Sequence, residues 1–183
     1  MRMGILLAAG QSRRFGAQNK LLAPCRGQAL VTWPAQALLA AGCDGVIAVV
    51  SSEAVARCLP PEIRCLRLPP GRPMSDSLVA GLLHARRSGA ESALLVLGDM
   101  PHVGPRLLRQ LLQRPEGAAC RHMARRLPPA HLPASAFDTI LNAPPGDHGA
   151  RAWIAALPES ALLPVDAATA GDVDRPHDLA GGC

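Results

Sequence analysis

The chain has 183 residues, of which 49% are hydrophobic and 18% charged, so it is long and apolar enough to bury a sizeable core. Its formal net charge is +5, but the arginines are dispersed and never cluster beyond pairs, which favours a small polyanionic substrate over nucleic acid. No apolar run of about 18 or more residues is present, so we expect no membrane span, and the absence of a C-x-x-C pair argues against a zinc site.

Strand and helix patterns alternate along the sequence. Short apolar runs and alternating segments predict strands at 3–8, 46–50, 64–68, 93–97, 118–120 and 162–165. Helical spacing and capping residues predict helices at 30–41, 52–59, 75–88, 105–113, 137–141 and 150–157, and a helical turn at 176–179. The segment 21–27 is expected to be irregular, and 121–133, rich in Arg and Pro, has no clear period.

This alternation predicts a three-layer α/β/α sandwich around a mainly parallel, Rossmann-like sheet. We expect residues 1–183 to form one domain. Because Arg2 alone makes no basic leader, the apolar run at 3–10 is interpreted as a buried strand and not an export signal, and a cytoplasmic protein is expected. In such sheets, ligands bind beyond the carboxyl ends of the strands.

A glycine-rich loop follows the first predicted strand. It holds Gly10 and Gly16, two arginines and then Lys20, the only lysine in the chain. The spacing matches neither the P-loop nor the G-x-G-x-x-G dinucleotide pattern. A compact ammonium after such a turn suits a polyphosphate, although the same residue fits an ordinary surface lysine beside a turn.

Acidic residues follow two other segments. Asp99 comes directly after the predicted strand at 93–97, where a carboxylate is well placed to hold Mg²⁺ with phosphate oxygens, or to form a plain turn. Asp172 and Asp174 alternate on an extended segment and can face one cation together. The competing interpretation of Asp174 is a helix cap ahead of Pro176.

The loop reads A-A-G-x-S-x-R-F-G-x-x-N-K-L-L over residues 8–22, and Gly-Asp-Met-Pro stands at 98–101. This pattern resembles the MobA-like nucleotidyltransferases, and most closely the molybdenum cofactor cytidylyltransferases. The resemblance implies the nucleotide-diphospho-sugar transferase type of fold. It also implies that the Gly-Asp-Met-Pro segment carries a metal ligand, with Asp174 as the second ligand and Asp172 as the lesser candidate.

Further residues acquire roles through the same resemblance. Residues 71–78 are similar to the family's G-x-x-x-S-S-L segment, with Asp76 in place of a small serine, and 146–151 are similar to its G-D-x-G-A-R motif. The nucleotide-binding residues implied are Leu7, Ala8, Ala9, Gly10, Ser12, Arg13, Arg14, Lys20, Ser75 and Ser77. The acceptor-binding residues implied are His102, Asp147 and Arg151. Residues 126–133 depart from the family pattern, which leaves the identity of the acceptor open.

The activity implied is Mg²⁺-dependent nucleotidyl transfer, with Arg14, Lys20 and Asp99 as catalytic residues. The Ala9-Gly10 pair resembles relatives that use cytosine nucleotides, so CTP is the expected donor. Molybdopterin cofactor is the expected phosphate-bearing acceptor, with a molybdoenzyme as a further partner. The alternatives are a sugar- or alditol-phosphate nucleotidyltransferase and a non-catalytic cofactor carrier or maturation partner.

Overall fold

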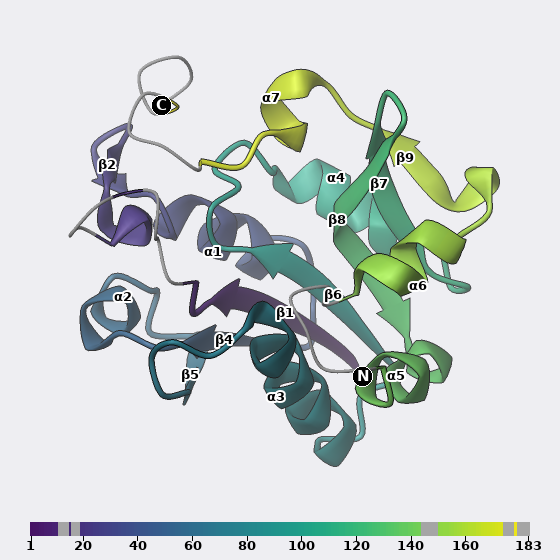
Figure 1. The fold of residues 1–183 in the computed structure, drawn as a ribbon, viewed down its shortest axis with the longest axis horizontal. Helices are drawn as coiled ribbons and strands as arrows, with labels where there is room; N and C mark the ends of the chain where they lie inside the picture. Colours follow the sequence, from purple (N-terminus) through teal and green to yellow (C-terminus); the bar gives the residue numbers. More distant parts are fainter. Residues whose placement is uncertain (11–14, 16–18, 144–149, 174–177, 179–183) are drawn as a thin grey trace.

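The structure is a computed structural model that describes residues 1–10, 15, 19–143, 150–173 and 178. Figure 1 shows a twisted central sheet with helices packed on both of its faces. None of the helices within these ranges has the length and apolar character needed to cross a membrane.

In the described residues the main sheet has seven strands, in the order β5-β4-β1-β6-β8-β7-β9. The strands are β1 (Arg2–Ala8), β4 (Gly45–Val50), β5 (Arg64–Arg67), β6 (Ser92–Leu97), β7 (Ala118–His122), β8 (Arg125–Pro133) and β9 (Leu162–Pro164). Pairs β1–β4, β1–β6, β4–β5 and β7–β9 are parallel, whereas β8 runs antiparallel to both β6 and β7. The expected mainly parallel sheet is therefore confirmed.

Two hydrophobic clusters make this a three-layer structure. The helices are α1 (Thr32–Leu39), α2 (Glu53–Arg57), α3 (Met74–Arg87), α4 (Pro105–Leu112), α5 (Ala134–Leu141), α6 (Arg151–Ala156) and α7 (Ala167–Ala170). Along β1, Leu6 and Ala8 join the cluster under α1, α2 and α4, while Ile5 and Leu7 join the cluster under α3, α5 and α6. Alternate side chains of one buried strand thus fill both cores.

Strand β1 lies at the centre of the parallel part, between β4 and β6 (Figure 1). Its register pairs Leu7 with Val49 on one side and with Leu97 on the other. The three strands consequently end together, and the segments that follow them meet at one edge of the sheet. The sequence-based expectation that the first strand and the strand at 93–97 converge depends on this pairing.

The prediction for the Arg- and Pro-rich segment at 121–133 needs the largest correction. Residues 125–133 form β8, a nine-residue strand, where the sequence shows no period. Pairing with β7 shifts from Ala119↔Ala130 to Cys120↔Leu127, so Pro128 and Pro129 fall in the irregularity between paired residues. Prolines lack the N–H that a ladder needs, and an irregularity of this kind is where a strand tolerates them.

Several smaller elements were not predicted from the sequence. Residues 21–27, expected to be irregular, contain the end of a 3₁₀ helix (Lys20–Leu22) and the first strand of a two-stranded hairpin, β2 (Pro24–Cys25) and β3 (Gln28–Ala29). Helix α7 is also additional, and Asp166 caps it by accepting from the backbone N–H of Thr169 at 2.8 Å. The expected helical turn at 176–179 lies outside the described residues except for position 178.

Candidate active site

The ends of β1 and β6 are joined directly. The backbone N–H of Gly98 donates to the carbonyl of Leu7 at 2.9 Å. A Cβ at position 98 would lie 3.1 Å from that carbonyl oxygen and 3.3 Å from the Cβ of Ala8, which is tighter than most real Cβ contacts. Glycine at position 98 therefore allows the backbone that leads to Asp99 to lie against the end of β1.

Lys20 and Asp99 form an ion pair across this junction. The Lys20 ammonium donates to Asp99 Oδ2 at 2.6 Å, although the residues are 79 positions apart in sequence. The side chain of Lys20 is 12% exposed and that of Asp99 is 13% exposed. Asn19 helps to present the lysine, because its side chain caps the 3₁₀ helix by accepting from the backbone N–H of Leu21. Lys20 is therefore not an ordinary surface lysine.

The electrostatics of Asp99 are dominated by burial. Removal from water raises the pKa of this carboxyl above its usual range, and the ion pair with Lys20 only partly offsets that rise. The negative charge of Asp172 raises the pKa further, which places this second carboxylate within electrostatic range of the first. Two acids and one lysine thus share the site, and a bound cation would relieve the repulsion between the acids.

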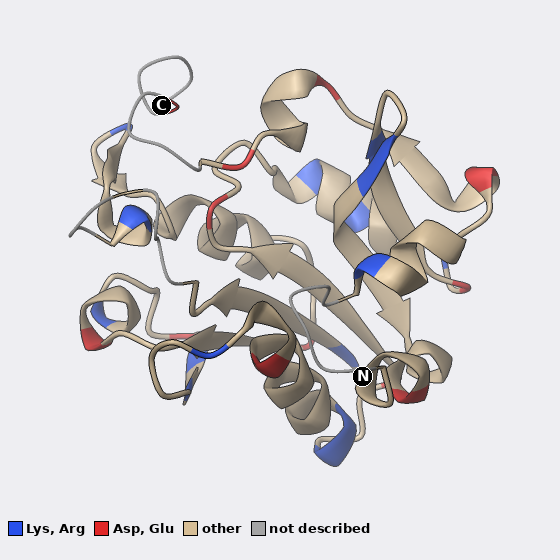
Figure 2. Cartoon of the chain, viewed as in Figure 1, with Lys and Arg blue, Asp and Glu red and all other residues tan. Residues whose placement is uncertain are grey.

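The donor set suits a divalent cation. Asp99 Oδ1 is buried and has no hydrogen-bond partner in the part of the chain that the structure describes. The backbone N–H of Val173 donates to the carbonyl of Asp99 at 3.0 Å, which brings the acidic segment at 172–173 beside the end of β6 (Figure 2). An unpaired carboxylate oxygen with a second acid nearby offers the few hard ligands that Mg²⁺ needs beside phosphate oxygens and water.

No group of three or more potential metal ligands is found among the described residues. The residue expected as the second ligand, Asp174, lies outside them, whereas Asp172 lies within them and is exposed. The structure therefore supports Asp99 as an available ligand and leaves the choice between Asp172 and Asp174 as a prediction.

Helix α3 begins at the same edge of the sheet, after β5 ends there. Ser77 is 3% exposed in its first turn, and Ser75 Oγ is buried without a partner among the described residues. The free amides and the positive end of a fourteen-residue helix favour anions at this point. Across the edge, the Ser51 hydroxyl donates to the carbonyl of Ala9 at 3.3 Å, next to Gly10.

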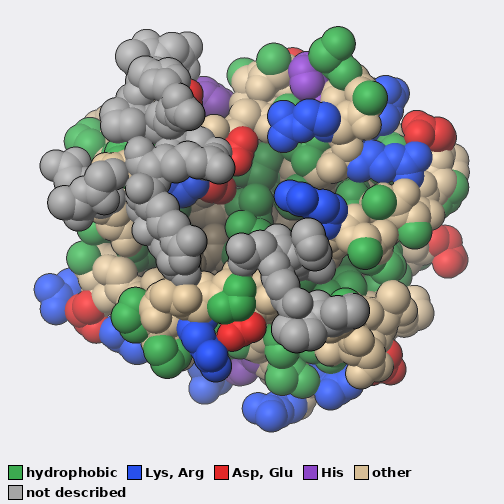
Figure 3. All heavy atoms as spheres, in the orientation of Figure 1, with side chains coloured by type: hydrophobic (Ala, Val, Ile, Leu, Met, Phe, Trp, Pro, Cys, Tyr) green, Lys and Arg blue, Asp and Glu red, His purple; other side chains and the backbone are tan. Residues whose placement is uncertain are grey.

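The other expected site residues are either outside the described residues or on other segments. Ser12, Arg13, Arg14 and Asp147 are outside the described residues. Arg151 is the exposed first residue of α6. Figure 3 shows basic side chains gathered over β7, β8 and α6. His102 lies in the turn after Asp99, and its charge is one of the smaller causes of the lowered pKa of Asp166, after hydrogen bonds from Thr169. The two acceptor-side residues are thus on different segments.

Two contacts in this region could not be found from the sequence. The bond from Val173 to the Asp99 carbonyl joins distant segments through the backbone alone, so no side-chain pattern indicates it. Arg26 donates from Nη2 to the carbonyl of Pro101 at 2.8 Å, directly beside the Gly-Asp-Met-Pro segment. The Arg-Gly pair at 26–27 is a turn signal that would have identified the hairpin, though not this contact.

Comparison with known families gives a match over most of the chain. The model of the MobA-like NTP transferase domain matches residues 4–161. Nicotine blue oxidoreductase from Paenarthrobacter nicotinovorans is 29% identical over 85% of this chain and 82% of its own length. A probable molybdenum cofactor guanylyltransferase from Mycolicibacterium paratuberculosis is 31% identical over 60% of this chain and 55% of its own length.

Solved structures give the same fold. Rv0371c from Mycobacterium tuberculosis superimposes with a TM-score of 0.82 at 25% identity, over 97% of this chain and 94% of that one. The CTP complex of CMP:2-keto-3-deoxy-manno-octonic acid synthetase superimposes with a TM-score of 0.71 at 16% identity, over 98% and 95% of the two chains. The architecture is therefore that of the nucleotide-diphospho-sugar transferases, as expected.

Proposed function

The chain belongs to the MobA-like NTP transferase family, and from this we propose that it transfers CMP from CTP to a phosphate-bearing acceptor and releases pyrophosphate. The observation that carries the proposal is the buried pair of Lys20 and Asp99 at the ends of β1 and β6, with one unpartnered carboxylate oxygen. We further propose that residues 1–183 act as one nucleotidyltransferase domain. The proposed acceptor is molybdopterin cofactor.

The proposed roles rest on the positions of the described residues and, for the others, on the resemblance to the family. Asp99 would hold a Mg²⁺ ion, with Asp174 or Asp172 as a second acidic ligand, and the ion would neutralise charge on the phosphates. Lys20 binds the triphosphate and favours the ionised form of Asp99, because its charge lowers the pKa that burial raises. Ser75 and Ser77, at the start of α3, bind the nucleotide with the backbone at 7–10 and with Ser12, Arg13 and Arg14. Arg14 neutralises the leaving pyrophosphate.

The reaction itself requires little covalent chemistry from the protein. An acceptor phosphate oxygen attacks the α-phosphorus in line, and the bond from that phosphorus to the bridging oxygen of pyrophosphate breaks. Catalysis of this kind depends on positioning and charge neutralisation, which a buried lysine and a buried aspartate supply. His102, Asp147 and Arg151 are proposed on the acceptor side, and none of them is needed as a strong general base.

Support for the finer assignments comes from relatives. One structural neighbour, at 23% identity and a TM-score of 0.71, is described as a manganese complex, which supports a divalent metal in this fold. The relative named as a probable molybdenum cofactor guanylyltransferase supports a molybdenum cofactor acceptor, and its name makes GTP the competing donor. CTP is proposed because the Ala9-Gly10 pair resembles relatives that use cytosine nucleotides. The relative named as an oxidoreductase indicates that the family also contains other named activities, so the reaction needs a direct test.

The test is Mg²⁺-dependent release of pyrophosphate, measured with each of the four nucleoside triphosphates. With CTP fixed, molybdopterin cofactor is compared with sugar and alditol phosphates. The proposal predicts release that requires both CTP and molybdopterin. Release only with a sugar or alditol phosphate would favour the second enzyme class, and binding without release would favour a carrier or a redox protein.

A further inference from the structure

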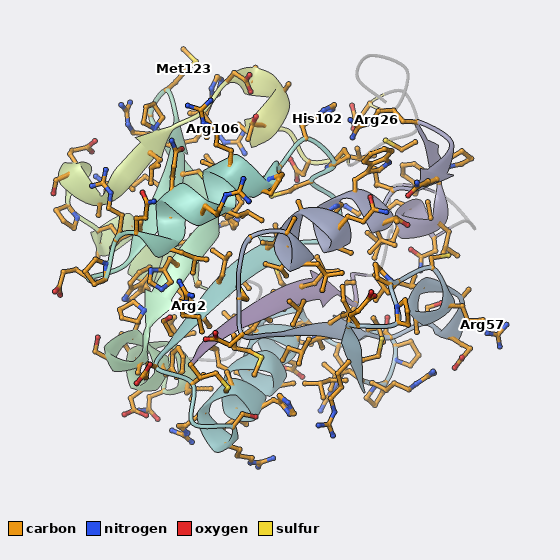
Figure 4. All side chains as sticks on the ribbon, turned by 180° about the vertical axis from the view of Figure 1, so that it is seen from behind. Arg2, Arg26, Arg57, His102, Arg106 and Met123 are labelled. Carbon is orange, nitrogen blue, oxygen red and sulfur yellow. The ribbon has the colours of Figure 1, made fainter. Side chains whose placement is uncertain are left out.

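A cavity opens on the α1 and α4 face of the sheet, away from the start of α3. Its volume is about 400 Å³, within the range of small-molecule pockets. It is lined by the hairpin, by one side of α1 and by the turn after Asp99, through Arg26, Trp33, Gln36, Ala37, Ala40 and residues 101–105. Figure 4 shows Arg26 and His102 next to each other at this end of the molecule.

The positively charged side chain of the pocket, Arg26, is held in place by neighbouring residues. Arg26 and Gly27 occupy the turn between β2 and β3, with φ angles of 48° and 82°, as a tight two-residue hairpin requires. The guanidinium carbon lies 4.0 Å from the centre of the Trp33 ring. The indole N–H of Trp33 in turn donates to the carbonyl of Cys25 at 2.8 Å, so the ring is fixed to the same hairpin.

The chemistry of the lining is complementary to an anion. Arg26 contributes a positive charge, and none of the described residues that line the pocket is acidic. A guanidinium has five N–H donors in a planar fork, of which Arg26 uses one on the carbonyl of Pro101. Gln36 and His102 add an amide and an imidazole, while Ala37, Ala40 and Val103 supply an apolar wall.

We propose that this pocket is a second ligand site, which binds a small organic anion with a carboxylate or phosphate head and a compact apolar body. The head would pair with Arg26, and the body would lie against α1. The site uses neither Lys20 nor the start of α3, so it is separate from the nucleotide site, and it shares only His102 with the proposed acceptor side. Since Arg26 also contacts Pro101, two positions after Asp99, a bound anion is expected to alter turnover, and only this consequence rests on the proposed function.

Fluorescence of Trp33 provides a direct readout. In a Trp153→Phe background, Trp33 is the only tryptophan, and the probes are benzoate, phenyl phosphate and the neutral benzamide. The proposal predicts a saturable change with at least one of the two anions, at least tenfold tighter than with benzamide. The anion that binds more tightly identifies the preferred head group. No saturable change with either anion would overturn the proposal.

Three variants locate the binding. Arg26→Gln is expected to weaken binding at least tenfold, because a charged hydrogen bond is lost, whereas Arg87→Gln, an exposed arginine at the end of α3, is the matched control. Ala40→Leu fills the pocket without altering the hairpin and is expected to have the same effect. Lys20→Ala is expected to leave binding unchanged. Loss of binding in Lys20→Ala alone would show that the anion occupies the nucleotide site, and would reject the proposal even if pyrophosphate release is confirmed.

Discussion

The Lys20 ammonium lies 2.6 Å from the Asp99 carboxylate, although one residue follows β1 and the other follows β6. Both side chains are nearly buried, and Asp99 keeps one oxygen unpartnered among the described residues. A buried carboxylate with an unused oxygen is costly unless a ligand completes its coordination. The stability of the unliganded protein and the proposed chemistry therefore depend on the same two residues.

Removing one partner of this pair should cost more than removing both. Lys20→Met leaves a buried carboxylate without a countercharge, and we expect a loss of about 3 kcal/mol in the free energy of unfolding. The double variant Lys20→Met/Asp99→Asn removes both charges and should lose less than either single variant. Urea unfolding measures the free energy of unfolding of Lys20→Met, Asp99→Asn and the double variant. Arg57→Met, which removes an exposed ion pair with Glu53, is the control and should cost under about 0.5 kcal/mol.

The pH dependence of stability should report the burial of Asp99. Its pKa is raised in the folded state, so the cost of burying its charge is full above the folded pKa and disappears as the pH falls toward the unfolded value. Lys20→Met raises that pKa further. The difference in unfolding free energy between wild type and Lys20→Met should therefore shrink on acidification. A difference that grows as the pH falls would contradict this assignment.

Packing between α3 and β1 gives a prediction that is independent of function. A Cβ at Gly81 would lie 2.8 Å from Cγ2 of Ile5, a rigid branch of a buried side chain. Gly81→Ala should therefore destabilise the protein by about 1 kcal/mol, because overpacking outweighs the gain in helix propensity.

An Ile5→Ala background tests that explanation, since it removes the obstructing methyl group. There, Gly81→Ala should become stabilising, because only the propensity gain remains. Thermal unfolding of the four proteins measures the coupling. If Gly81→Ala were equally destabilising in both backgrounds, the contact with Ile5 would not be the cause.

Ala9 should influence the choice of nucleotide. It is buried at the end of β1, and its carbonyl accepts from the Ser51 hydroxyl. If its methyl group limits the space for the base, Ala9→Gly should raise the use of GTP relative to CTP by about tenfold, the scale of one methyl group in a pocket. The ratio of kcat/KM for the two triphosphates measures this. Ala48→Gly, which removes a methyl group from the buried middle of β4, is the control and should leave the ratio unchanged.

Sequence reasoning predicted the parts of the fold that depend on local patterns. The continuous apolar runs of β1, β4 and β6 identified buried strands. Because these strands alternate with helices, a parallel sheet was expected, and the segments that carry Lys20 and Asp99 were expected at the same edge of it. The sequence did not predict β8, because its prolines interrupt the alternation of apolar and polar residues that indicates a strand. Only its pairing with β6 and β7 shows that it is one. Sequence reasoning also failed for backbone contacts such as Val173 with Asp99, because a main-chain hydrogen bond leaves no trace in residue types.

The convergence of Lys20 and Asp99 was expected from the sequence only in outline. Residue types and spacing identified Lys20 and Asp99 separately, but their direct ion pair is a tertiary contact across 79 positions. The burial that raises the pKa of Asp99 depends on packing from several segments and is likewise invisible in the sequence. Arg14, Asp147 and Asp174 lie outside the described residues, so their roles stay predictions.

The most direct test of the central claim is pyrophosphate release by Asp99→Asn, with the triphosphate and acceptor that the wild type uses. The matched control is Asp138→Asn, which removes an exposed carboxylate paired with Arg86 on the far side of the molecule from Asp99. We predict a loss of at least about a hundredfold in kcat/KM for Asp99→Asn and a change within about twofold for the control. A folded Asp99→Asn protein that retains wild-type release would contradict the assignment of Asp99 to the metal–triphosphate site.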